Sequence, residues 1–288
     1  MNPTLPRPLP EARLPAAARA GTITTMIRRL LLLAPLLASC SDPQAPLRIA
    51  FAPVFDGKTL VCGDSADVVQ LTDLRFYVSD IKLVAASGEV VDMQLDADGI
   101  WQQTDLAFLD MENGEGYCDN GTANLNSSLR GQAPQQDYVG LQFTVGVPFE
   151  RNHADPLLAA APLGEGAMHW HWRAGYKFLR AGVRTADDGF WLHLGSTGCK
   201  GTVQDITSCR SPNRVNVELL DFIPGEEIVA VDLTALVARS ELEDGIATDC
   251  SSGPAESSCP APFASLGLDH NTGTPTRSQR LFRKLVRD

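Results

Sequence analysis

Histidines are the residues of this sequence whose type and spacing point to chemistry. There are five of them: His153, His169, His171, His193 and His270. The first four lie within 41 residues of one another. Neutral imidazole binds transition metals, and together with the thioether of Met168 it suits Cu(I). The sequence has no glycine-rich phosphate loop, Gly-x-Ser-x-Gly or His-Glu-x-x-His motif, so a metal site is favoured over those catalytic classes.

The densest candidate segment is a predicted strand that begins Met168-His169-Trp170-His171-Trp172. Successive side chains of a strand point to opposite faces. One face would therefore carry both histidines, and the other would carry the methionine and both tryptophans. Composition alone leaves open whether the tryptophan face forms an interior site, whether the histidines form a clamp, or whether tryptophans simply pack opposite exposed histidines.

The N-terminal segment predicts export. Residues 26–37 combine a charged start with an apolar run that is too short to span a bilayer. They are followed by Ala38-Ser39-Cys40, which resembles the bacterial lipobox and predicts a lipid on Cys40, and Ser41 favours the outer membrane, facing the periplasm or the cell surface. The alternative is a plain cleaved signal with an unmodified Cys40. Residues 1–25 precede a good start at Met26 and are left out of the predicted fold.

The mature chain is predicted to be one acidic domain. Residues 1–39 contain five Arg and one Glu, so their removal changes the formal charge from −11 to −15. Such a surface repels nucleic acid and anionic lipid, and membrane contact is expected through the lipid anchor alone. We expect a tether at 40–46, a metal-binding domain at 47–243, and a disulfide loop with a basic, solvated tail at 244–288.

Six cysteines remain besides Cys40, an even number that favours disulfides in an exported protein. Six cysteines allow fifteen pairings. Proximity along the chain favours Cys199 with Cys209 and Cys250 with Cys259, which leaves Cys62 for Cys118. A zinc site of four cysteines is the alternative, but the sequence lacks the Cys-x-x-Cys spacing typical of such sites.

Short runs rich in β-branched and aromatic residues recur between turn signals, which predicts an all-β fold, an antiparallel β-sandwich with disulfide-held loops. The expected strands cover 47–55, 58–62, 74–84, 89–95, 138–147, 168–179, 190–194, 215–220 and 228–231. Helical signal is limited to one turn at 156–161 and a short helix at 233–239 that follows Asp232.

Several motifs together resemble one family. Trp170-x-Trp172 followed by Gly175-Tyr176-Lys177-Phe178 is similar to a signature of the MbnP-like copper-binding proteins, which are found beside methanobactin operons and are also called metallo-mystery pair four-Cys proteins. Further matching stretches are Asp73 to Ser79, Leu109-Asp110 before Cys118, Gly146 to Phe149 with Asn152-His153-x-Asp155, and His193 to Cys199. The resemblance runs from about Leu47 to Leu233. The pair Cys250 and Cys259 and the doubled histidine around Trp170 depart from the pattern.

The resemblance implies a protein that binds one Cu(I) and has no catalytic role. It implies that a partner dihaem enzyme of the cytochrome c peroxidase type (MbnH-like) oxidises Trp170 to kynurenine, whose aryl amine and ketone can bind a metal. By the same resemblance His153 and His193 are the expected imidazole ligands and Met168 a soft contact, with His169 and His171 as second choices. The expected role is copper homeostasis.

Two other functions stay open on the sequence. The chain could be a metal-independent envelope module that binds a protein partner through its acidic surface, with incidental histidines. It could also be a copper enzyme, which requires an open coordination position; no acid or base stands out in the sequence for that role.

Overall fold

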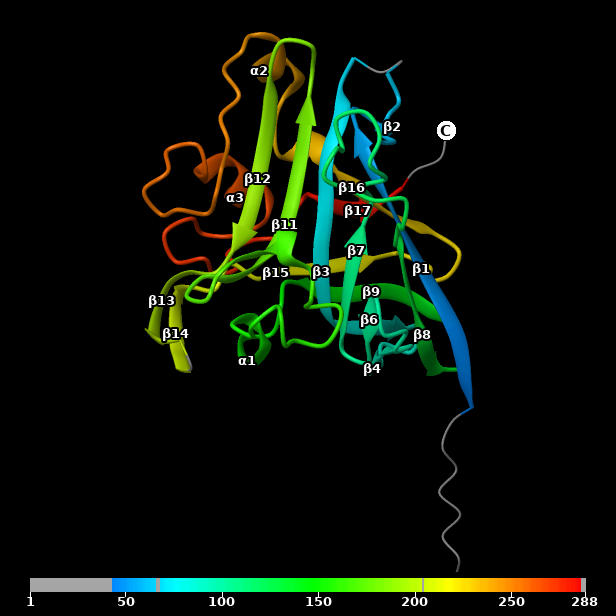
Figure 1. Ribbon diagram of the computed structural model, residues 1–288. Helices are drawn as coiled ribbons and strands as arrows, with labels where there is room; N and C mark the ends of the chain where they lie inside the picture. Colours follow the sequence, from blue (N-terminus) through cyan, green and yellow to red (C-terminus); the bar gives the residue numbers. More distant parts are fainter. Residues whose placement is uncertain (1–42, 66–67, 204, 286–288) are drawn as a thin grey trace, which may run out of the picture. The chain divides into compact units, whose positions relative to one another are not determined.

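The computed structural model describes residues 43–285, apart from residues 66–67 and 204. The predicted signal segment and the predicted lipidation site at Cys40 lie outside these residues. Within them, strands form two large sheets and one small sheet (Figure 1). None of the helices in the described part of the chain is long and apolar enough to cross a membrane.

The first sheet has the strand order β17-β16-β1-β8-β5, with β2 paired to β1. Its strands are β1 (Gln44–Phe55), β2 (Lys58–Thr59), β5 (Gln94–Leu95), β8 (Ser128–Pro134), β16 (Ile228–Asp232) and β17 (Phe282–Lys284). Its pairings are antiparallel except that of β1 with β16, which is parallel.

The second sheet has nine strands, with β3 at its centre. Its path is β10-β11-β3-β7-β6, with β12 paired to β11, β4 and β9 to β3, and β15 to β9. The strands are β3 (Gln70–Ala85), β4 (Val90–Asp92), β6 (Gln102–Gln103), β7 (Leu106–Asp110), β9 (Tyr138–Val145), β10 (His169–His171), β11 (Gly175–Arg184), β12 (Gly189–Gly195) and β15 (Val215–Leu220). A separate hairpin consists of β13 (Thr197–Thr202) and β14 (Asp205–Ser211).

Helical elements are short. They are α1 (Phe149–Asn152), α2 (Arg239–Glu243), α3 (Pro260–Ser265) and the 3₁₀ turns η1 (Gly166–Met168) and η2 (Leu233–Ala235). The side chain of Asp232 accepts a hydrogen bond from the Thr234 N–H and so caps η2. The all-β sandwich fold predicted from the sequence is confirmed.

The central strand β3 is buried on both faces. Its residues Leu74, Phe76 and Val78 belong to the main core between the sheets, whereas Tyr77 belongs to a second apolar cluster. Because alternate residues of a strand face opposite sides, the second cluster lies on the outer face of the nine-stranded sheet. Its members are Tyr77, Leu106, Phe108, Val147, Leu163, Met168, Tyr176 and Phe178. The segment that contains η1 covers this part of the sheet.

The predicted single strand over 168–179 is wrong, because the chain turns within it. Met168 ends η1, β10 has three residues, residues 172–174 form a turn, and β11 begins at Gly175. Gly175 has a φ of +78°, and a β-carbon there would lie 2.2 Å from the Asn152 carbonyl oxygen. Glycine is therefore required at this position, and simple alternation does not hold across the segment.

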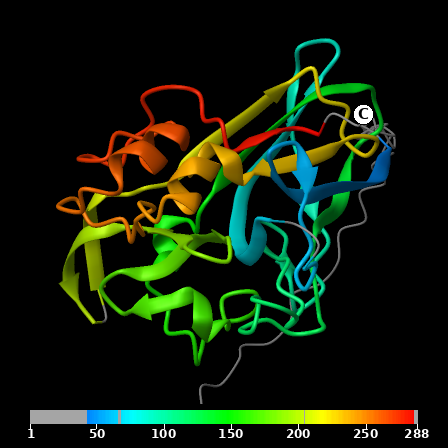
Figure 2. The ribbon, with the colours of Figure 1, turned by 90° about the horizontal axis from the view of Figure 1, so that it is seen from above.

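The prediction of a solvated tail after the disulfide loop is also wrong. Phe263, Leu266 and Phe282 are buried in the main core. In Figure 2 the red strand β17 runs beside β16, with which it pairs. Two basic residues of this strand make ion pairs, Arg283 with Asp232 at 2.8 Å and Lys284 with Glu227 at 2.6 Å. Scattered apolar residues, separated in the sequence by basic and small residues, pack into the core and make residues 260–284 part of the sandwich.

Three disulfides link the pairs predicted from the sequence: Cys62–Cys118, Cys199–Cys209 and Cys250–Cys259. The first and third are buried in the main core. The second joins directly opposed residues of β13 and β14. The predicted pairing is confirmed.

Candidate metal centre

The candidate ligands come from three segments of the chain. His193 lies on β12, which is one of the strands of the nine-stranded sheet. His153 follows α1, whereas His169 and Trp170 lie on the short strand β10. Strand β10 pairs with β11, and β11 pairs with β12, so the sheet itself brings these segments toward one another.

His193 offers a neutral imidazole with an unused nitrogen. Its Nε2 is buried and has no hydrogen-bond partner. Burial, and then the charges of Arg180 and Lys177, lower the pKa of His193 to about 4. The ring is therefore uncharged near neutral pH and keeps a lone pair for a metal.

Trp170 lies beside this strand. A β-carbon at Gly195 would come within 2.7 Å of the Trp170 ring atom Cζ3, so the indole occupies the space that glycine leaves open. Gly195 and His193 are two residues apart on β12 and face the same side of the sheet. Lys177, paired with Gly195 across the strands, holds its Nζ 5.9 Å from the centre of the Trp170 ring. Trp170 and His193 thus share one part of the outer face.

His169, a second-choice ligand on the sequence, has the same feature as His193: a buried ring nitrogen without a hydrogen-bond partner. This nitrogen is Nε2, and the His169 ring contacts Tyr176 edge-on with centroids 5.1 Å apart. Burial, and then the charge of His171, lower its pKa. His171 itself is exposed, and its Nδ1 accepts a hydrogen bond from the Arg173 N–H at 3.3 Å.

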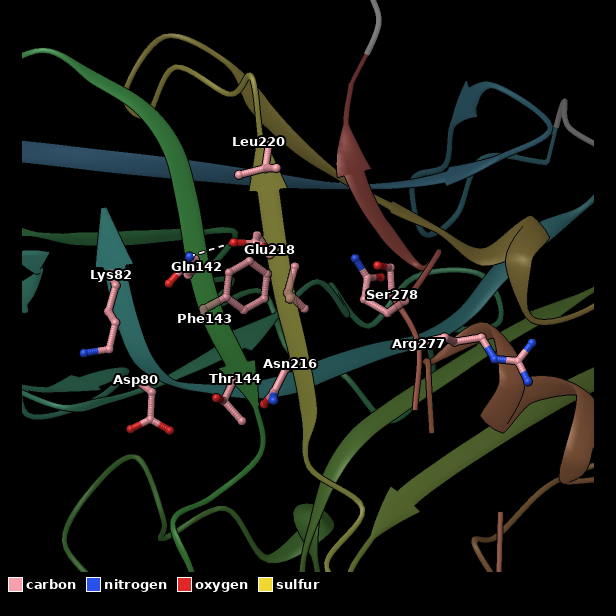
Figure 3. A pocket seen from close by; sticks show the side chains of 12 residues that line it. Asp80, Lys82, Gln142, Phe143, Thr144, Asn216, Glu218, Leu220, Arg277 and Ser278 are labelled. Atoms are coloured by element: carbon pink, nitrogen blue, oxygen red, sulfur yellow. Dashed lines mark hydrogen bonds between the residues drawn. The ribbon is translucent and has the colours of Figure 1, made fainter. Parts of the chain in front are cut away.

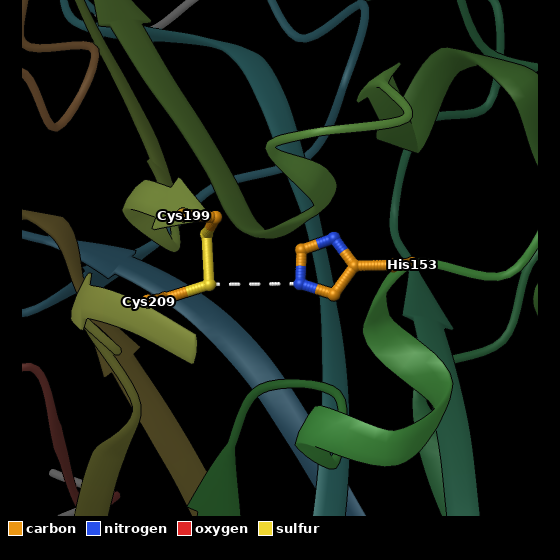
Figure 4. Close-up of side chains that lie close together, drawn as sticks. All are labelled: His153, Cys199 and Cys209. Atoms are coloured by element: carbon orange, nitrogen blue, oxygen red, sulfur yellow. Dashed lines mark hydrogen bonds between the residues drawn. A yellow bond between two sulfur atoms is a disulfide. The ribbon is translucent and has the colours of Figure 1, made fainter. Parts of the chain in front are cut away.

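His153 points toward a disulfide. Its Nε2 lies 3.6 Å from Cys209 Sγ (Figure 4), and its Nδ1 lies 3.3 Å from the Trp172 carbonyl oxygen. Burial lowers the pKa of His153. The charge of His153 also contributes to lowering the pKa of His169, which places the two rings within electrostatic range.

Met168 is fully buried within the second apolar cluster, among aromatic side chains such as Tyr77 and Tyr176. It ends η1 rather than lying on a strand with Trp170. The structure therefore assigns its side chain a packing contact, while the unused nitrogens belong to His169 and His193.

A buried charge cluster lies beside His193 and was not singled out as chemistry in the sequence. Arg180 is directly opposite His193 on β11 and pairs with Asp73 at 2.5 Å. Arg75 contacts both Asp73 and Glu112 at 3.1 Å. Burial, and then the neighbouring Asp73, raise the pKa of Glu112 to about 9. The available signal is a pair of charged residues, Asp73 and Arg75, that alternate with apolar residues in the stretch Leu71 to Val78 of the central strand.

Asp73 has the opposite shift. Burial acts to raise its pKa, but hydrogen bonds with Glu112 and Arg75 outweigh burial and lower it. Glu112 is therefore the member of this carboxyl pair that holds the proton, while Asp73 is the charged partner of both arginines. The cluster adds fixed positive charge beside His193, which favours its neutral form.

Two groups of cysteines with a third residue bring possible ligand atoms within 4.8 Å of one another: His153 with Cys199 and Cys209, and Glu256 with Cys250 and Cys259. All four cysteines are in disulfides. Metals bind thiolates, so neither group is a metal site while its disulfide is intact.

A groove of about 650 Å³ lies elsewhere, along β9 and β15. Asp80, Lys82 and Glu218 line it together with residues 277–279 (Figure 3). None of the candidate ligands is among the lining residues, so this groove is separate from the histidine cluster.

Fold and site together define a disulfide-stabilised β-sandwich that presents uncharged imidazoles beside a tryptophan. A family model described as MbnP matches residues 44–252, and the chain belongs to the MbnP family. Among solved structures, MbnP from Methylosinus trichosporium is 30% identical with a TM-score of 0.72, over 83% of this chain and 98% of that chain. No curated protein matches. The resemblance found in the sequence motifs is confirmed.

Proposed function

We propose that this chain is an exported, lipid-anchored copper-binding protein that takes part in copper homeostasis. Its Cu(I) site depends on oxidation of Trp170 to kynurenine by a partner dihaem enzyme of the cytochrome c peroxidase type. Membership of the MbnP family supports a binding protein rather than an enzyme. The lipid on Cys40 holds the chain at the outer membrane.

The observation that carries the proposal is the unused Nε2 of His193 beside Trp170. A buried polar atom without a partner costs about 1–3 kcal/mol, and a bound metal would remove that cost. The imidazole of His193 is uncharged near neutral pH, as a metal-binding histidine must be. His169 provides a second unused nitrogen on the same strand as Trp170. The proposed donors are imidazole nitrogens, which suit copper.

Oxidation gives Trp170 a role that an indole cannot fill. The indole N–H is a donor and has no free lone pair, whereas kynurenine carries an aryl amine and a ketone. Trp170 is only partly buried, so electrons can leave it toward a partner docked at the surface. His153, with its Nδ1 against the Trp172 carbonyl, remains the further proposed ligand.

The first experiment is mass spectrometry of the chain co-expressed with its dihaem partner, followed by Cu(I) titration. We expect residue 170 to lose one carbon and gain one oxygen, and the modified protein to bind one Cu(I). Trp170→Phe should lose this binding. The matched control is Trp172→Phe, which changes the other partly buried tryptophan of the same hairpin and should retain it. Equal Cu(I) binding by Trp170→Phe would refute the proposal.

The anchor has its own test. Cys40→Ser should release the chain from membranes into the soluble envelope fraction and abolish labelling by a fatty acid. A Cys40→Ser chain that stays lipid-labelled and membrane-bound would contradict the lipidation site.

A further inference from the structure

His153, the further ligand of the proposed copper site, also lies against the Cys199–Cys209 disulfide, and the copper proposal leaves that second contact unexplained. A ring nitrogen of His153 and both sulfur atoms lie within 4.8 Å of one another (Figure 4). We propose that reduction of this disulfide creates a second metal site, in which Cys199, Cys209 and His153 bind a thiophilic d¹⁰ cation such as Zn(II) or Cu(I).

The spacing of the donor atoms supports a site. Zinc binds sulfur at about 2.3 Å and imidazole nitrogen at about 2.0–2.1 Å, so a tetrahedral site separates a nitrogen and a sulfur ligand by about 3.6 Å. His153 Nε2 lies 3.6 Å from Cys209 Sγ. One ligand pair thus already has its coordinated distance. The two sulfurs must move to about 3.8 Å apart, which breaking their bond permits.

The hydrogen bonds of His153 also leave Nε2, the nitrogen that faces the disulfide, as the one that could bind a metal. The Trp172 carbonyl 3.3 Å from Nδ1 can only accept a hydrogen bond, so this contact places the proton on Nδ1. Nε2 then carries the lone pair; the amide nitrogen of Asn152 lies 3.4 Å from it, and a bound metal would take the place of that long contact. A backbone carbonyl that orients the ring from behind is the usual companion of a metal-binding histidine.

Cys199–Cys209 is the disulfide best placed to be reduced. Cys209 is partly exposed, whereas the other five disulfide cysteines are buried. A thiolate must reach a sulfur atom to break a disulfide, so exposure favours this pair. The two-stranded sheet of β13 and β14 pairs with neither large sheet in the described part of the chain. Such hairpins are marginally stable alone, so the strands can adjust.

The chemistry requires a dithiol reductant. The dithiol gives two electrons and two protons to the Cys199–Cys209 bond, so that two cysteine thiols form and the reductant leaves as a disulfide. Binding of a divalent cation then releases the two thiol protons as the thiolates coordinate. The fourth position is left for water.

The second cysteine group provides an internal comparison. Cys250 and Cys259 are buried. Glu256 already accepts hydrogen bonds from the N–H groups of Ser251 at 2.7 Å and Gly253 at 3.2 Å. This carboxylate holds the loop, and no such site is proposed there.

The test uses the mature chain, mildly reduced without air by a phosphine that is then removed. Alkylation and peptide mass spectrometry should find free thiols at Cys199 and Cys209 and intact bonds at the other two pairs. Titration with Cd(II) should give thiolate-to-metal absorption that saturates at one ion per reduced chain, and none in the oxidised chain. Reduction of a buried pair first, or free thiols at both positions without Cd(II) binding, would overturn the proposal.

Variants separate the ligands. The double variant Cys199→Ser with Cys209→Ser should lose the thiolate-to-Cd(II) absorption. If the double variant does not fold, the single variant Cys209→Ser replaces it and should lose the one-ion saturation of the parent. His153→Ala should weaken Cd(II) binding by more than the roughly 10-fold to 100-fold that outer-shell changes cost; unchanged affinity would remove the histidine from the site. Reduced Trp170→Phe should bind Cd(II) like the parent, which separates this inference from the proposed copper site.

Discussion

Trp170 and Gly195 occupy complementary space: the indole of one lies where the other lacks a side chain. The ring atom Cζ3 would be 2.7 Å from a β-carbon at position 195, and the Tyr176 carbonyl oxygen would be 2.8 Å from it. The position of the tryptophan that we propose to be oxidised is thus set by a glycine two residues after the candidate ligand His193.

Gly195→Ala should therefore destabilise the fold and move the indole. Overpacking of this kind costs about 1–3 kcal/mol, measurable by urea unfolding, and the tryptophan emission should shift. Gly166→Ala is the matched control, because a β-carbon there meets nothing within 4 Å. An alanine at 195 that costs no more than the control would show that the indole does not depend on this glycine.

Protonation of His193 should make the copper-free protein less stable in mild acid. The pKa of His193 is about 4 in the folded chain, against 6.5 for the unperturbed side chain, because burial and nearby cations oppose its charge. The unfolded chain binds more protons between these pH values, so stability is present above pH 6.5 and is lost as pH falls toward 4. After allowance for solvent screening, the loss is at most about 2 kcal/mol.

The check is the free energy of urea unfolding from pH 7 to pH 4 for the parent and for His193→Gln. The variant should show a shallower fall over this range. His171→Gln changes an exposed histidine and serves as the control. Parallel curves for parent and His193→Gln would mean that His193 does not carry this dependence.

Much of the sandwich follows from local signals. The strand 215–220 alternates strictly between buried and exposed residues, as its sequence pattern predicts. The cysteines that are close in sequence form disulfides with each other, also as predicted. The hairpin after Trp170 was missed because the turn is set by Gly175 meeting Asn152, a contact between segments that the sequence does not join. Similarly, the charge cluster depends on Glu112 and Arg180 meeting Asp73, three residues far apart in the chain.

The candidate site was only partly predictable for the same reason. The residue types and the family resemblance pointed to His153, Trp170 and His193. The unused nitrogen of His169 follows from its burial against Tyr176, and the burial of Met168 follows from the 3₁₀ turn that ends there. The positions of His169 and Met168 depend on how residues 166–171 cross the sheet, and the alternation of apolar and polar residues in the sequence does not show this.

The disulfides should differ in their contributions to stability. Cys62–Cys118 closes a separation of 56 residues, and Cys199–Cys209 one of 10. Chain entropy gives about 4 kcal/mol for the longer loop and about 2.7 kcal/mol for the shorter. Alanine pairs at each position, compared by urea unfolding, should keep this order. A larger loss at Cys199–Cys209 would show that the hairpin supports the sandwich beyond its own loop.

The two carboxyl groups of the charge cluster should respond in opposite ways to neutral substitution. Glu112 holds a proton in the folded chain, because burial and Asp73 raise its pKa to about 9. Its folded pKa exceeds the unfolded value of 4.5, so folding takes up a proton and the contribution of Glu112 to stability is lost as pH rises between these values. Glu112→Gln keeps the shape and removes this dependence.

We therefore expect Glu112→Gln to be as stable as the parent at pH 5 and more stable at pH 8. Asp73→Asn should instead cost about 3–5 kcal/mol at either pH, because it leaves Arg75 and Arg180 buried without their shared anion. Urea unfolding of both variants at the two pH values checks this. If Glu112→Gln is as damaging as Asp73→Asn at pH 8, then Glu112 is ionised in the folded chain, and the proton lies elsewhere in the cluster beside His193.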